Sequence, residues 1–139
     1  MTIPAFSIFS AASELVVTAG VAIVVGRNWQ RKKFPLALFL AVALFEALVN
    51  VAYMANRTAR AASGADPMSS SLRLAFALHG MISLLAYLWF VVLGVIAAVQ
   101  QQADRFWFRD HRVHTVLFLV VWTISVGSGE AMFVVRYLL

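Results

Sequence analysis

The chain of 139 residues is 63% hydrophobic and only 12% charged, which is far more apolar than an ordinary soluble domain. It contains no cysteine, which excludes disulfides, thiolate metal ligands and thiol nucleophiles. Its net charge of +5 comes from basic residues scattered at the ends of apolar segments, and this pattern does not indicate a nucleic-acid-binding protein. The composition predicts an integral membrane protein that is surrounded by lipid.

Four apolar runs have the length of roughly 20 residues that a helix needs to cross a bilayer core. They cover about 5–26, 34–55, 72–99 and 113–139. The connections between them are short, and none is long enough to form a separate domain. The sequence therefore predicts a single all-α domain, a four-helix membrane bundle of up-down-up-down topology.

The connections predict how the bundle is oriented. Most Lys and Arg residues lie in the first and third connections, which are therefore expected in the cytoplasm, with both termini outside. The third connection, QQADRFWFRDHRVH, alternates aromatic and charged residues and is expected on the membrane surface. The second, NRTARAASGADPMSSS, is expected to be an external loop, with a helix cap within Ser69–Ser71.

Polar side chains recur at three- and four-residue steps in the first two runs, so they form stripes along one helix face. Ser10 and Glu14 belong to the first stripe, and the second comprises Glu46, Asn50 and Tyr53. At 1.5 Å per residue, Glu14 and Glu46 each lie about 18 Å from the cytoplasmic end of their helix. Because two ionised carboxylates at one depth are costly, we expect one to be protonated or a cation to lie between them.

The other two runs carry polar residues in the same outer half. His79 and Ser83 lie one turn apart in the third run, and Glu130 lies in the last. Because hydrocarbon cannot form hydrogen bonds, these groups are expected to face a common polar chamber. Ser125 and Gly129, close to Glu130, form a small-x-x-x-small pair that favours close helix packing.

Glu14, Glu46, His79 and Glu130 allow three interpretations. They are ligand types of a transition-metal site for copper, iron or zinc. They are also the residue types of an intramembrane proton or cation pathway. Alternatively, they hydrogen-bond to one another and only hold the bundle together. The sequence lacks the Glu-x-x-His motif of carboxylate-bridged metal sites, and it leaves the three interpretations open.

The histidines lie at opposite ends of their helices. His111 and His114 open the last run on the cytoplasmic side, whereas His79 lies near the outer start of the third. A haem with two axial histidines needs both at one level, so such a haem is not expected, but His79 can supply one axial ligand. The sequence also has no phosphate loop, zinc-protease helix or nucleophile elbow, which favours a role other than catalysis.

The run HRVHTVLFLVVWTISVGSGEAMFVVRY, which contains His111, Trp122 and Gly129, resembles the last helix of a family of small four-helix bacterial membrane proteins. That family includes the cytochrome c oxidase maturation factor CtaM. The segment LHGMISLLAY is similar to its third helix and places His79 at the family's histidine. Two further histidines of the family have no counterpart here, so the resemblance carries over His79 and His111 as cofactor-binding positions.

The resemblance implies an assembly factor or accessory subunit of a respiratory haem-copper oxidase that handles haem or a metal ion. It implies a multi-pass protein of the bacterial inner (cytoplasmic) membrane, and its partners would be oxidase subunits or further copies of this chain. A cofactor-free structural subunit of a larger complex is the alternative.

Overall fold

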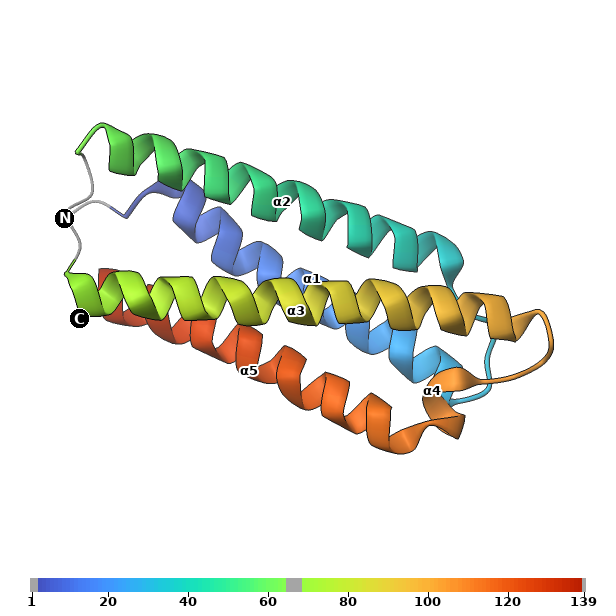
Figure 1. The fold of residues 1–139 in the computed structure, drawn as a ribbon. Helices are drawn as coiled ribbons and strands as arrows, with labels where there is room; N and C mark the ends of the chain where they lie inside the picture. The colour runs from blue at the N-terminus through green and yellow to red at the C-terminus, as the bar shows by residue number, and fades with distance from the viewer. Residues whose placement is uncertain (1–2, 65–68, 139) are drawn as a thin grey trace.

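The computed structural model describes residues 3–64 and 69–138, and these ranges are helical apart from short connections (Figure 1). The helices are α1 (Ala5–Trp29), α2 (Leu36–Ala62), α3 (Ser70–Gln101), α4 (Trp107–Asp110) and α5 (Arg112–Tyr137). Of these, α1, α2, α3 and α5 are long and apolar enough to cross a membrane. The predicted all-α four-helix membrane bundle is confirmed.

Successive long helices run in opposite directions, so α1 begins and α5 ends at the same end of the bundle, termed here the terminal end (Figure 1). The opposite end carries α4 and is termed the α4 end. Helix α1 packs against α2 and α5, and α5 packs against α3, whereas α2 and α3 contact each other least among the neighbouring pairs of long helices. The ring of four helices is therefore least closed between α2 and α3.

The boundaries of the second connection differ from the prediction. Helix α2 continues through Arg57 and Arg60 to Ala62, because the alanine-rich and arginine-rich stretch favours a helix. Gly64, with a φ of +68°, follows the end of the helix. The predicted cap of the next helix is confirmed at Ser69, whose hydroxyl accepts the Leu72 N–H at 3.3 Å. Residues 65–68 of this connection lie outside the described residues.

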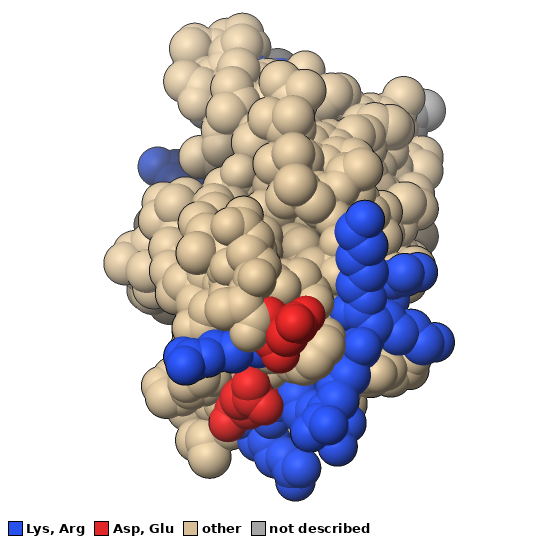
Figure 2. All heavy atoms as spheres, turned by 90° about the vertical axis from the view of Figure 1, so that its right-hand side faces the viewer, with Lys and Arg blue, Asp and Glu red and all other residues tan. Residues whose placement is uncertain are grey.

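The third connection also needs a correction, because it does not lie wholly on the surface. Trp107 and Phe108 of α4 are buried in the end of the bundle. The side-chain oxygen of Asn28 in α1 accepts the Phe108 N–H at 3.0 Å, and the Thr115 hydroxyl of α5 donates to the Phe108 carbonyl at 2.7 Å. The aromatic residues thus plug this end, while Lys and Arg side chains gather on its outer face (Figure 2).

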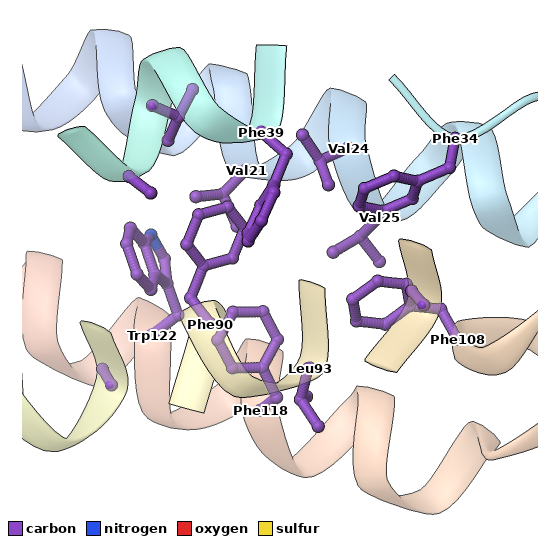
Figure 3. Close-up of a cluster of buried hydrophobic side chains, with 14 of the residues drawn as sticks. Val21, Val24, Val25, Phe34, Phe39, Phe90, Leu93, Phe108, Phe118 and Trp122 are labelled. Atoms are coloured by element: carbon purple, nitrogen blue, oxygen red, sulfur yellow. The ribbon is translucent and has the colours of Figure 1, made fainter. Parts of the chain in front are cut away.

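The hydrophobic core lies between the middle of the bundle and the α4 end (Figure 3). The ring centroid of Phe90 lies 5.2 Å from that of Phe39, 6.2 Å from that of Phe118 and 5.8 Å from that of Trp122. The Phe39 ring of α2 fills the space beside Gly94 of α3, where any Cβ would collide with it. This contact closes α2 onto α3 in the α4 half, and the terminal half stays open.

Candidate functional site

A cavity of about 820 Å³ lies between α1, α2, α3 and α5 in the terminal half of the bundle. Its volume falls within the range of roughly 300–1,000 Å³ that is typical of ligand pockets. Residues predicted from the sequence make up much of its polar lining: Ser10, Glu14, Glu46, Asn50, Tyr53, His79 and Ser83. Helices α1, α2 and α3 thus bring these side chains to one cavity, and their role in binding stays a prediction.

Two of the predicted residues do not line the cavity. Glu130 lies beside it on α5, within electrostatic range of Glu14. Its Oε1 atom is buried and has no hydrogen-bond partner in the described part of the chain. His111 lies at the α4 end, where its ring stacks on Trp107 with centroids 4.6 Å apart and its Nδ1 lies 3.1 Å from the Trp107 carbonyl oxygen. His79 and His111 therefore cannot share one cofactor.

His79 is contacted by one serine of α5, Ser128, and one of α3, Ser83. The Ser128 hydroxyl donates its proton to the Ser125 carbonyl at 2.8 Å. Ser128 Oγ also lies 2.9 Å from His79 Nδ1. While Ser128 donates to the Ser125 carbonyl, its oxygen can accept only from a protonated Nδ1. In that tautomer the lone pair of the neutral ring is on Nε2, which lies 3.4 Å from the Ser83 hydroxyl. This tautomer would present Nε2 to a ligand.

Gly129 provides the space in which His79 and Glu14 meet. A Cβ at this position would lie 2.9 Å from His79 Cε1, 3.3 Å from His79 Nε2 and 3.0 Å from Glu14 Oε2. The neighbouring Ser125 is buried, and its hydroxyl lies 2.7 Å from that of Ser83 in α3. The small residues of α5 therefore face α3 as the packing motif predicts, and the gap over Gly129 is filled by an imidazole and a carboxyl group.

Glu14 and Glu46 face the cavity from α1 and α2 and lie within electrostatic range of each other. Asn50 Nδ2 donates to Glu46 Oε1 at 2.7 Å, which fixes the second carboxyl group. Among residues 3–64 and 69–138, no three His, Asp or Glu side chains form a group that could hold a metal ion. The predicted metal ligands share one region of the bundle without forming a ligand cluster, and a metal site stays a prediction.

The mouth of the cavity lies between α2 and α3. Its lining includes Val51 and Met54 of α2 and Met81 and Leu84 of α3, and all four side chains are more than half exposed on the outside of the bundle. In a membrane these side chains contact lipid. The cavity therefore has a polar inner wall and an apolar mouth that opens sideways toward the bilayer.

The inner end of the cavity is closed by hydrogen bonds and aromatic rings. The Tyr87 hydroxyl of α3 donates to the Ala43 carbonyl of α2 at 3.1 Å. Trp122 Nε1 of α5 donates to the Thr18 hydroxyl of α1 at 3.1 Å, and the cluster of Phe39, Phe90 and Phe118 follows toward the α4 end. The cavity thus occupies one half of the bundle.

Sequence reasoning missed three residues of the site. Arg57 lies at the rim with its Cζ 4.0 Å from the centroid of the Phe76 ring, and Ser128 orients His79. Arg57 continues the stripe that contains Glu46, Asn50 and Tyr53, so the helical repeat could have identified it. Ser128 and Phe76 carried no such signal, because their roles depend on which helix packs against them.

No protein-family model matches the chain, and no curated protein or solved structure matches it significantly.

Proposed function

We propose that this protein is a membrane-embedded binding protein for haem, and that it serves a respiratory haem-copper oxidase as assembly factor or accessory subunit in the bacterial inner membrane. The observation that carries the proposal is the lateral cavity with His79 on its inner wall. The Ser128 hydroxyl lies 2.9 Å from Nδ1 of the imidazole, and Nε2 is the nitrogen that would bind a ligand.

The shape and polarity of the cavity support an amphipathic ligand that arrives from the lipid phase. Exposed apolar side chains form the mouth between α2 and α3, and polar groups form the inner wall. A ligand that is soluble only in the bilayer needs no aqueous route to such a site. An assembly factor would hold this ligand until the oxidase subunits take it over.

The residues present fit a haem better than a bare metal ion. A haem can be held through a single nitrogen ligand, which His79 would supply, whereas a bare ion needs several ligands in one cluster. Phe76, Met132 and Phe133 provide apolar and sulfur-containing surfaces on the cavity wall for a porphyrin ring. A bound haem would supply the iron and the porphyrin that the oxidase requires.

The geometry gives less support to a proton or cation pathway. Such a pathway needs polar groups across the whole bilayer. The polar lining ends near Tyr87, beyond which Phe39, Phe90 and Phe118 pack against one another. A cofactor-free structural subunit remains the alternative that the binding experiment decides.

The experiment is a haemin titration of the purified protein in lipid nanodiscs, followed by the Soret band. We expect one haem per chain in the wild type and, for His79→Ala, an affinity at least about tenfold lower. His111→Ala is the matched control, because it removes an imidazole at the α4 end and should leave the affinity unchanged. Equal binding by all three proteins would contradict the proposal. A wild type that binds no haemin would favour the structural subunit.

A further inference from the structure

A second, smaller hollow of about 20 Å³ lies at the terminal end and is lined by three arginines, Arg57 and Arg60 of α2 and Arg136 of α5. It is termed here the arginine annex. Within the described ranges, no Asp or Glu belongs to its lining. Since a single water needs about 10–15 Å³, the annex has room for an end group and not for a whole molecule.

The arginine annex adjoins the large cavity. Ser7, Tyr53, Arg57 and Tyr137 line both hollows, and the Ser7 and Tyr137 hydroxyls lie 3.2 Å apart between them. A molecule whose body lies in the cavity would therefore have the annex next to one of its ends, across the Ser7 and Tyr137 side chains.

Two of the guanidinium groups are brought together by one aromatic ring. The Cζ atom of Arg57 lies 4.0 Å from the Phe76 ring centroid, and the Cζ atom of Arg136 lies 5.5 Å from the same centroid. Both guanidinium groups thus make cation–π contacts with the same ring, which places them on one side of the annex. Guanidinium groups match the geometry of carboxylate and phosphate groups.

We infer that the arginine annex binds the anionic group, a carboxylate or a phosphate, of an amphiphile whose apolar body occupies the cavity. The inference deepens the proposed function because it concerns the same cavity, but it does not depend on iron or on His79. Two sources offer this chemistry, the propionates of a haem and the phosphate of an anionic phospholipid.

The test compares two pairs of ligands that differ in charge. One pair is haemin and its dimethyl ester, and the other is phosphatidylglycerol and phosphatidylcholine with identical acyl chains. We expect the wild type to bind the charged member of at least one pair about tenfold more tightly, since charge-assisted hydrogen bonds to guanidinium are strong. Arg57→Gln should abolish this preference, and Arg60→Gln is a second variant should Arg57→Gln fold poorly. Arg27→Gln, at the α4 end, should retain it.

Each outcome has one meaning. A preference within the porphyrin pair identifies the propionates as the anionic group, and a preference within the lipid pair identifies the lipid phosphate. Equal binding within both pairs, or a preference that survives both Arg57→Gln and Arg60→Gln, overturns the inference. His79→Ala separates the two proposals: if only haem binding through His79 is wrong, the charge preference persists and His79→Ala has no effect on haemin affinity. If only the inference about the arginine annex is wrong, the charge preference is absent and His79→Ala still weakens haemin binding.

Discussion

At the scale of single residues, helical periodicity placed most of the polar lining correctly. Glu46, Asn50 and Tyr53 follow one helix face, and all three line the cavity. The predicted depth of Glu130 did not show whether its side chain faces the cavity. The adjacent Gly129 is the residue of α5 that faces His79 and Glu14. A sequence gives the height of a residue in a helix, but the direction in which it points depends on where the neighbouring helices lie.

Gly129 yields the sharpest prediction at this scale. Glycine to alanine in a helix normally stabilises a protein by about 1 kcal/mol. In Gly129→Ala the new methyl group would lie 2.9 Å from His79 Cε1 and would displace the imidazole. We expect a haemin affinity at least about tenfold lower, as for the loss of a group that orients a ligand. Soret titration measures this change.

The matched control is Gly127→Ala, because the space around that position is open. It should keep the wild-type affinity and show an equal or higher melting temperature. Equal affinities for Gly129→Ala and Gly127→Ala would show that the gap over Gly129 does not position His79.

At the scale of helices, the long spans were predictable and the short segments were not. Helix α2 runs past its predicted end because Arg57 and Arg60 stand among alanines, which extend a helix regardless of the nearby Gly and Pro. Helix α4 has only four residues, which is too few to show a periodic pattern. Its burial depends on the side chain of Asn28, which lies 80 residues away in sequence.

Asn28→Ala tests how α4 is held. The change leaves the buried Phe108 N–H without its acceptor, which costs about 1–3 kcal/mol of unfolding free energy. We expect a lower melting temperature in detergent, with unchanged haemin affinity because the cavity lies in the other half of the bundle. Gln30→Ala, at an exposed position just after α1, is the control and should melt like the wild type. An unchanged melting temperature for Asn28→Ala would mean that this hydrogen bond does not hold α4.

At the scale of the whole molecule, composition was enough to predict the fold class. Four apolar runs joined by short connections predict an antiparallel bundle. The opening between α2 and α3 was not predictable, because it depends on which pairs of helices pack closely. The Phe39–Gly94 contact closes that interface in only one half of the bundle.

The orientation in the membrane is a separate prediction, since the charge bias places both termini outside. The chain has no cysteine, so single cysteines can be introduced at exposed positions at either end. In intact cells an impermeant maleimide should label Ser63→Cys and should not label Gln102→Cys. Permeabilised cells should label both. If only Gln102→Cys were labelled in intact cells, the protein would have the opposite orientation, with both termini in the cytoplasm.

The central claim is that polar side chains of the terminal half face a cavity instead of lipid. Its most direct test is the maleimide reactivity of two single-cysteine variants of α1, because only a thiol that can ionise in contact with water reacts. Ser10→Cys lies on the cavity wall, and Ala22→Cys lies on an exposed face toward lipid. We expect rapid labelling at position 10, protection there by added haemin and little labelling at position 22. Equal reactivity at the two positions, with no protection by haemin, would contradict the claim.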